Sequence, residues 1–357
     1  MADPGLRTAT SADLHAAADA LGLSPAALAP ALVEPRARVL VGVEGQVVLL
    51  RRQWADDATA EAVAVRRTGV PLDHPDVLAT AAGWGCDRVR HLATDRVGEV
   101  PLPPADAPLA VRFAVLSALA ATRVETAVAL ARGTGVARTK DDGSPAVAAD
   151  GAAHAAAVAV LGDLGVPVLS EESSDAPVPD GSPWIVLDPL DGTGNFAAGL
   201  PPWAFSAALV DDGRPVAGLV ADLSSGRRWW ALEGRGAVRD GVPIGPRPGG
   251  TVVVPSGPRG AVVGVPETAR RVRITGCTAV DLCLVADGAA AAWHDVDRSG
   301  THVHDVAGGL AVLLAAGGTA LTEEGEPLRL RPDTETKIRL VAAADETTAR
   351  ELLAALA

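Results

Sequence analysis

A short apolar run that ends in two aspartates constrains the fold of this chain more than any other segment. Residues 184–187, Trp-Ile-Val-Leu, favour strands and are bounded by turn-forming residues, so they predict a buried strand. The run ends at Asp188, and Pro189 and Gly192 then predict a tight turn. Asp191 stands three residues beyond Asp188, across this turn. The sequence therefore predicts two carboxylates that converge at the carboxyl end of a strand.

The groups around this turn have the chemistry of a metal and anion site. The carboxylates of Asp188 and Asp191, with the Leu190 carbonyl, are hard oxygen ligands of the kind that suits Mg²⁺. Thr193 is placed to cap a following helix, and the amides of Gly192 and Thr193 would then face an anion at the helix N-terminus. Taken alone, Asp-x-x-Asp-Gly also fits a solvated surface turn. The apolar strand before it favours the site.

The segment Asp-Pro-Leu-Asp-Gly-Thr-Gly-Asn-Phe, residues 188–196, resembles the signature of the inositol monophosphatase family. Members of that family are Mg²⁺-dependent, lithium-sensitive phosphatases of sugar, cyclitol and nucleotide phosphates. The resemblance runs from about residue 108 to about residue 330. It implies an α+β and α/β fold, a layered α-β-α-β-α sandwich with the active site between two sub-domains.

Composition limits the possible partners and the compartment. The chain has 357 residues and a net charge of −13, which argues against a surface that binds a nucleic acid polymer. The three cysteines are odd in number and have no Cys-x-x-Cys spacing, which indicates reduced thiols. The N-terminus has no basic stretch followed by an apolar one, and we find no run long enough to span a bilayer. We therefore expect a cytoplasmic protein that does not bind membranes.

Residues 1–104 form a predicted small α+β unit of unknown role. Residues 38–50 predict a β-hairpin with a Gly turn, and residues 58–67 predict a helix. The Pro-rich segment 102–108 is the clearest linker in the chain.

Two predicted sub-domains follow the linker. Residues 108–245 would form a metal-binding α+β sub-domain that begins with a long amphipathic helix, from Leu109 to about Ala131. Residues 250–357 would form an α/β sub-domain that completes the active site. Within it, residues 252–254 predict a strand and residues 267–271 a helix.

The resemblance adds further acidic residues to Asp188 and Asp191. It implies that Asp150 opens a helix, that Glu171 follows a strand, and that Asp305 lies at a helix N-terminus. By resemblance, Glu171, Asp188 and the Leu190 carbonyl hold one Mg²⁺, and Asp188, Asp191 and Asp305 hold a second. Asp150 and Glu171 would position a third ion or its water, and Thr193, hydrogen-bonded towards Asp150, would orient the attacking water.

The resemblance also implies substrate contacts. Gly276, Cys277 and Thr278 match the site that touches the ring hydroxyls in the family, although a close-packed helix start explains Cys277 nearly as well. His302 is a further expected contact; His302 and His304 alternate as they would on a strand. Where many inositol phosphatases place a Glu against the substrate, this chain has Arg298, which admits a substrate with an extra anionic group.

These residues predict a phosphoric monoester hydrolase with two or three Mg²⁺ ions per site. Its substrate would be a small-molecule phosphate monoester of a cyclitol, sugar or related polyol. Histidinol phosphate and 3′-phosphonucleotides stay open as alternatives. A catalytically silent, metal-binding regulatory protein is a hypothesis of another class, disfavoured because all five acidic positions are present. Homodimers are common in the family, so a homodimer is possible here.

Overall fold

The computed structural model describes residues 38–43, 46–51, 61–66, 88–91, 96–99, 103–131, 136–139, 145–172, 178, 181, 183–240, 242–253, 269–295 and 300–356. The chain divides into two compact units. One comprises residues 1–118 with 240–242, and the other residues 119–239 with 243–357. The boundary between them lies within the first long helix. The further division of the larger unit into sub-domains at residues 245–250 stays a prediction.

The first unit contains a five-stranded sheet with the order β3-β2-β1-β4-β5. Its strands are β1 (Arg38–Val43), β2 (Gln46–Arg51), β3 (Glu61–Arg66), β4 (Arg88–His91) and β5 (Arg96–Glu99). The predicted hairpin is confirmed, since β1 and β2 pair antiparallel from Arg38↔Arg51 to Val43↔Gln46. The predicted helix over residues 58–67 is wrong, because β3 pairs antiparallel with β2. The alternating segment Glu-Ala-Val-Ala-Val-Arg suits a strand once a partner strand is present.

Helix α5 (Leu109–Ala131) confirms the predicted long helix. By length and composition alone it could cross a membrane, which differs from our expectation that no run is long enough. The difference arises because its most apolar window, with a mean hydropathy of 1.5, carries at most two charged residues. However, 56% of that window is buried inside the protein, and a core helix has the same composition.

The larger unit is built on a seven-stranded sheet with the order β14-β13-β12-β11-β10-β9-β8. Its strands are β8 (Val168–Ser170), β9 (Trp184–Asp191), β10 (Ala204–Asp211), β11 (Arg214–Asp222), β12 (Arg228–Leu232), β13 (Gly236–Arg239) and β14 (Val242–Pro243). Strand β8 is parallel to β9, and β9 to β13 pair antiparallel in chain order. The sheet thus places the carboxyl ends of β8 and β9 at the same edge.

A second five-stranded sheet has the order β16-β15-β17-β19-β18. Its strands are β15 (Thr251–Val253), β16 (Arg271–Arg273), β17 (Ala292–His294), β18 (Thr319–Thr322) and β19 (Leu340–Ala343). The helix predicted over residues 267–271 is wrong at Arg271, which begins β16 parallel to β15, while residues 267 and 268 lie outside the described residues. Arg271 and Arg273 alternate with Val272 on this edge strand.

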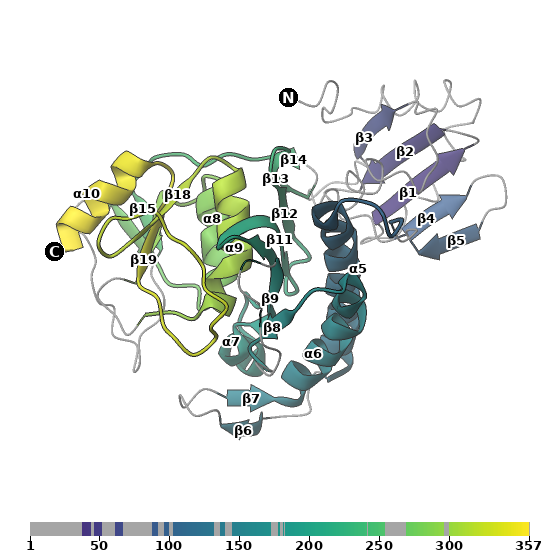
Figure 1. Cartoon of the computed structure of the whole chain (residues 1–357), viewed down its shortest axis with the longest axis horizontal. Helices are drawn as coiled ribbons and strands as arrows, with labels where there is room; N and C mark the ends of the chain where they lie inside the picture. The colour runs from purple at the N-terminus through teal and green to yellow at the C-terminus, as the bar shows by residue number, and fades with distance from the viewer. Residues whose placement is uncertain are drawn as a thin grey trace. The chain divides into compact units, whose positions relative to one another are not determined.

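The helices separate the sheets into layers. They are α6 (Ala148–Leu161), the 3₁₀ helix η1 (Gly162–Leu164), α7 (Thr193–Ala198), α8 (Thr278–Ala286), α9 (Val303–Ala315) and α10 (Glu346–Leu356). Helices α8 and α9 lie between the seven-stranded sheet and the second five-stranded sheet, which contains β15 to β19 (Figure 1). Helix α6 covers the outer face of the seven-stranded sheet, and α10 covers the outer face of the second five-stranded sheet. The small hairpin of β6 (Val136–Thr139) and β7 (Pro145–Val147) precedes α6. This is the expected α-β-α-β-α sandwich.

The main core lies where α8 and α9 pack between the sheets. It consists largely of Ala, Val and Leu, with Trp229 from β12 and Trp293 from β17 fully buried. Helix α9 contacts the sheet very closely: a Cβ atom on Gly218 of β11 would lie 2.4 Å from the Ala311 Cβ of α9. The close approach fixes α9 against the strands that carry the candidate site.

Candidate active site

Strand β9 delivers two carboxylates to one face through an irregularity in its pairing with β10. The strand continues past its predicted end at Asp188 and reaches Asp191. Residues three apart on a regular strand point to opposite faces. Here Asp188 pairs with Ser206 and Asp191 with Ala204, so three steps on β9 match two on β10. This bulge, which contains Pro189, restores both aspartates to the same face.

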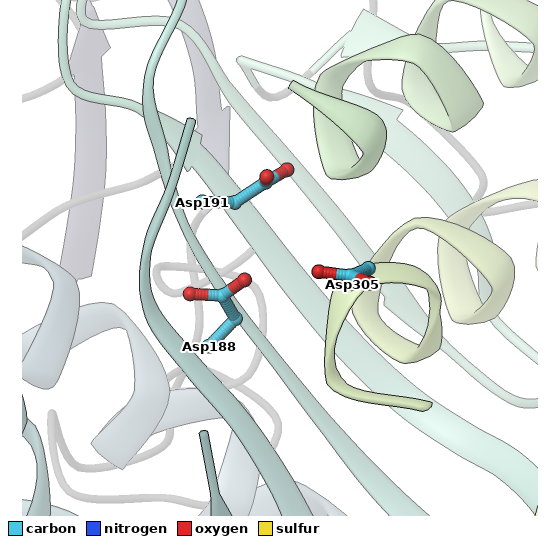
Figure 2. Close-up of side chains that lie close together, drawn as sticks. All are labelled: Asp188, Asp191 and Asp305. Atoms are coloured by element: carbon cyan, nitrogen blue, oxygen red, sulfur yellow. The ribbon is translucent and has the colours of Figure 1, made fainter. Parts of the chain in front are cut away.

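Asp305 approaches the same point from the first turn of α9. Figure 2 shows Asp188 and Asp191 rising from β9 towards Asp305, which points back at them from the helix. One carboxylate oxygen from each of the three aspartates lies within 4.8 Å of the others. Asp188 and Asp191 are buried and Asp305 is partly exposed. The structure thus brings together three of the residues that the sequence analysis assigns to metal.

The surroundings of Asp191 change the pKa of its carboxyl group. Burial, and then the negative charge of Asp305, raise the pKa of Asp191 from 3.8 to about 7. The Ala279 amide and the Cys277 thiol partly oppose this by hydrogen bonding to the carboxylate. A divalent cation would supply the missing positive charge, and a set of three carboxylates fits a hard cation. The residues present therefore fit a metal ion.

Each aspartate of the cluster accepts a hydrogen bond from a nearby backbone amide. The Leu190 N–H donates to Oδ1 of Asp188 over 3.1 Å. The Ala279 N–H donates to Oδ2 of Asp191 over 2.7 Å. Asp305 Oδ2 accepts the His302 N–H over 2.9 Å. The carboxylates are thus oriented by the bulge of β9 and by the first turns of α8 and α9.

Thr193 lies beside Asp150, as expected. Its Oγ1 is 3.2 Å from Asp150 Oδ1 and 3.0 Å from the Leu190 carbonyl oxygen, so its single hydroxyl proton can go to either acceptor. Thr193 is the first residue of α7 rather than its cap; the capping position is Gly192, which adopts φ 81°. Only glycine takes this conformation readily, because a side chain would clash.

Glu171 follows β8 directly, at the same sheet edge as the aspartates. Its amide donates to the Leu187 carbonyl over 3.2 Å, and its charge contributes to the raised pKa of Asp191. One residue earlier, the buried Ser170 hydroxyl lies 2.9 Å from His154 Nδ1. That hydrogen bond joins the end of β8 to α6, the helix that carries Asp150.

The expected substrate contacts lie near the aspartates to different degrees. Cys277 is the N-cap of α8, its Sγ is 3.1 Å from Asp191 Oδ2, and Thr278 begins the helix. Burial and the Asp191 charge raise the pKa of Cys277, so its thiol keeps its proton. Gly276 has φ 81° and packs against the Asn195 side chain, which donates to the Thr275 carbonyl. Arg298 lies outside the described residues.

The two histidines are not on a strand, contrary to expectation. His302 is the N-cap of α9 and His304 lies within its first turn, because α9 already begins at Val303. Their rings stack at 5.1 Å with an interplanar angle of 5°. The His302 Nδ1 lies 2.8 Å from the Thr334 carbonyl oxygen, which can only accept, so Nδ1 carries the proton.

Sequence reasoning missed two donors to the cluster. Thr301 donates its hydroxyl proton to Asp305 Oδ2 over 2.8 Å, and the thiol of Cys277 donates to Asp191 rather than serving only as a substrate contact. A Thr four residues before a first-turn aspartate is a weak signal for the first contact. No local signal announces the second, since Cys277 and Asp191 come together only in the fold.

The sequence profile of the inositol monophosphatase family matches residues 111–357. A fructose-1,6-bisphosphatase/inositol-1-monophosphatase of Thermococcus kodakarensis is 34% identical over 197 residues, which cover 54% of this chain and 75% of that protein. A probable inositol 1-monophosphatase of Mycobacterium tuberculosis is 34% identical over 187 residues, 47% of this chain and 67% of that protein. A histidinol-phosphatase of the same organism is 45% identical over 101 residues, 28% of this chain and 38% of that protein.

Solved structures support the fold. A Pyrococcus horikoshii protein described as similar to inositol-1 monophosphatase has a TM-score of 0.59 at 23% identity, covering 67% of this chain and 95% of that chain. An inositol monophosphatase-fructose 1,6 bisphosphatase has a TM-score of 0.60 at 23% identity, and the match covers 68% of this chain and 98% of that chain. The profile match, the curated relatives and the three clustered aspartates agree. This chain belongs to the inositol monophosphatase family and is a phosphoric monoester hydrolase.

Proposed function

We propose that this phosphatase is Mg²⁺-dependent and hydrolyses the phosphate monoester of a small polyol, such as a cyclitol or a sugar. The observation that carries the proposal is the cluster of Asp188, Asp191 and Asp305, three carboxylates within 4.8 Å of one another. Burial, and then the negative charge of Asp305, raise the pKa of Asp191 to about 7. A phosphate dianion would be repelled there unless cations were bound first.

The ligand set follows from the placement of the oxygens. Asp188, Asp191 and Asp305 would hold Mg²⁺, with Glu171 and the Leu190 carbonyl as further expected ligands. When bound, the ion neutralises charge on the phosphate and its leaving oxygen and lowers the pKa of water. The bulge in β9 supports this assignment, because it brings Asp188 and Asp191 to one face of the strand.

Thr193 and Asp150 would orient the attacking water. The Thr193 hydroxyl has one proton, which it donates to one of the two acceptors within reach, Asp150 Oδ1 or the Leu190 carbonyl oxygen. The hydroxyl oxygen is then left to accept a hydrogen bond from water. Asp150 is buried, so solvent competes little with the Thr193 hydroxyl for its carboxylate. The amides of Gly192 and Thr193 are the expected donors to the phosphate.

Histidinol phosphate is a second candidate substrate. The observation that favours it is the match to the histidinol-phosphatase of Mycobacterium tuberculosis, which at 45% is a higher identity than that of the inositol phosphatase relatives, although over a shorter stretch. An amine-bearing substrate also suits a site that is rich in carboxylates.

The test is phosphate release from a panel of cyclitol, sugar, histidinol and 3′-nucleotide phosphates, with Mg²⁺, with EDTA and with Mg²⁺ plus Li⁺. We expect release from one class only with Mg²⁺, and inhibition by Li⁺. Asp191→Asn should abolish release. Asp222→Asn is the matched control, because Asp222 is also a buried aspartate that accepts backbone amides but lies outside the cluster. Release that is equally fast in EDTA would refute the proposal.

A further inference from the structure

We infer that Cys277 and Thr301 are positioning residues of the metal site, each fixing one aspartate of the cluster through a side-chain hydrogen bond. The inference rests on the proposed function, because it assigns these residues a role towards a bound cation. The two side chains lie on separate segments: Cys277 is the N-cap of α8, and Thr301 directly precedes His302, the N-cap of α9. Both donate to a carboxylate that also accepts a backbone amide.

On the first side, Asp191 is held by the start of α8. Its Oδ2 accepts the Ala279 N–H over 2.7 Å and the Cys277 thiol over 3.1 Å. Cys277 is itself fixed, because its amide donates to the Thr275 hydroxyl over 3.2 Å and its side chain is fully buried. The thiol has two acceptors within reach, both on Asp191, and the carboxylate Oδ2 at 3.1 Å is nearer than the backbone carbonyl oxygen at 3.7 Å.

On the second side, the arrangement is repeated with a hydroxyl. Asp305 Oδ2 accepts the His302 N–H over 2.9 Å and the Thr301 hydroxyl over 2.8 Å. The backbone of Thr301 is fixed by two hydrogen bonds to Ile338, its amide donating over 2.9 Å and its carbonyl accepting over 2.8 Å. Thr301 is 9% exposed, so its hydroxyl competes little with solvent.

The two pairs of donors have the same effect on the two carboxylates. In each case both hydrogen bonds fall on Oδ2, and within the described residues no hydrogen bond falls on Oδ1 of Asp191 or Asp305. Asp305 Oδ1 is 3.8 Å from His304 Nε2, beyond hydrogen-bond distance. One oxygen of each carboxylate is thereby left for a cation. Single-oxygen ligation suits the compact shell of Mg²⁺, whereas larger cations also use both oxygens.

The donors also oppose the repulsion between the carboxylates. One carboxylate oxygen of Asp191 lies within 4.8 Å of one of Asp305, so without a cation the two negative charges repel each other. A hydrogen bond to Oδ2 keeps each side chain facing the cluster before the ion arrives. Partners of metal ligands that orient them in this way typically change metal affinity by about 10- to 100-fold when removed.

The test is calorimetric titration of the full chain with MgCl₂, without substrate, on paired variants. Cys277→Ala and Thr301→Val remove the donors, and each should raise the Kd for Mg²⁺ by about tenfold. Cys277→Ser and Thr301→Ser keep a donor and should stay close to the wild-type Kd. Cys283→Ala is the matched control, because Cys283 is also fully buried on α8 but does not contact the cluster. Its melting temperature measures what loss of a buried thiol costs by itself.

Outcomes for this inference and for the proposed function are separable. Unchanged Mg²⁺ affinity in Cys277→Ala and Thr301→Val would overturn the inference, even if the protein is a Mg²⁺-dependent phosphatase. A loss of affinity that the Ser variants do not restore would also overturn it, because donation would then not be the cause. Weaker Mg²⁺ binding in the two donor-less variants, restored by Ser, supports the inference even if no tested ester is hydrolysed. A wild-type chain that binds no Mg²⁺ would overturn both.

Discussion

Replacing Asp191 by Asn should make the metal-free protein more stable at neutral pH. Burial and the charge of Asp305 raise the pKa of Asp191 from 3.8 to about 7, so the folded state binds a proton more tightly than the unfolded state does. A carboxyl group with a raised pKa makes the free energy of unfolding fall as pH increases between these two values. Asn has the same shape, keeps an acceptor for the Ala279 amide and carries no charge.

The size of the effect follows from the two pKa values. At about 1.4 kcal/mol for each pKa unit, the gap from 3.8 to about 7 corresponds to roughly 4 kcal/mol once pH exceeds 7. At pH 5, which lies between the two pKa values, the charge of Asp191 lowers the free energy of unfolding of the wild type by about 2 kcal/mol. Without metal, the advantage of Asp191→Asn over the wild type should therefore grow by about 2.6 kcal/mol from pH 5 to pH 8.

The assay is urea denaturation in EDTA at pH 5, 6, 7 and 8, followed by tryptophan fluorescence, with both proteins measured in parallel. Adding Mg²⁺ should narrow the difference at pH 8 by more than half, because a cation stabilises the folded wild type and Asp191→Asn loses a ligand. At a concentration one hundred times Kd this stabilisation is about 2.7 kcal/mol. A metal-free wild type with the same pH profile as Asp191→Asn would refute the reasoning.

Two other predictions concern the pair Thr193 and Asp150, which would orient water, and the packing of α9 against the sheet. Thr193→Ala and Asp150→Asn should each lower kcat by about 10²- to 10⁴-fold with little change in KM. The double variant should be no slower than the slower single one, because the two act as a unit; additive losses in steady-state kinetics would contradict this. Gly218→Ala would place a Cβ 2.4 Å from the Ala311 Cβ, so α9 must move away from the sheet. We expect the free energy of unfolding, measured by urea denaturation, to fall by about 1–3 kcal/mol. Mg²⁺ should also bind more weakly, since Asp305 moves with the helix. Unchanged Mg²⁺ affinity would show that α9 moves without displacing Asp305.

Much of the larger unit could be predicted from local sequence patterns. The apolar residues between Leu109 and Ala131 recur with the helical period, and the apolar run 184–187 predicts the strand that became β9. The convergence of Asp188 and Asp191 with Asp305 also agrees with what the resemblance implies. The helix and the strand could be predicted because each is encoded within a single element, whereas the approach of Asp305 to β9 was implied by the resemblance alone.

The failures occur where distant partners decide the structure. Residues 61–66 became a strand because β2 offers a pairing edge, and Arg271 joined β16 because β15 lies beside it. The extension of β9 to Asp191 depends on the bulge against β10, which no residue of β9 announces. The contact of Cys277 with Asp191 likewise joins segments that are far apart in sequence.

The placement of the aspartates on β9 and on α9 has a consequence for the stability of the whole unit. A cation held by Asp188, Asp191 and Asp305 would tie together two segments that are roughly a hundred residues apart along the chain. Such an ion acts as a removable cross-link that closes a long loop, and its contribution rises with the logarithm of the free metal concentration. Resistance to heat, to denaturant and to proteolysis would then rise and fall with the supply of free metal around the protein.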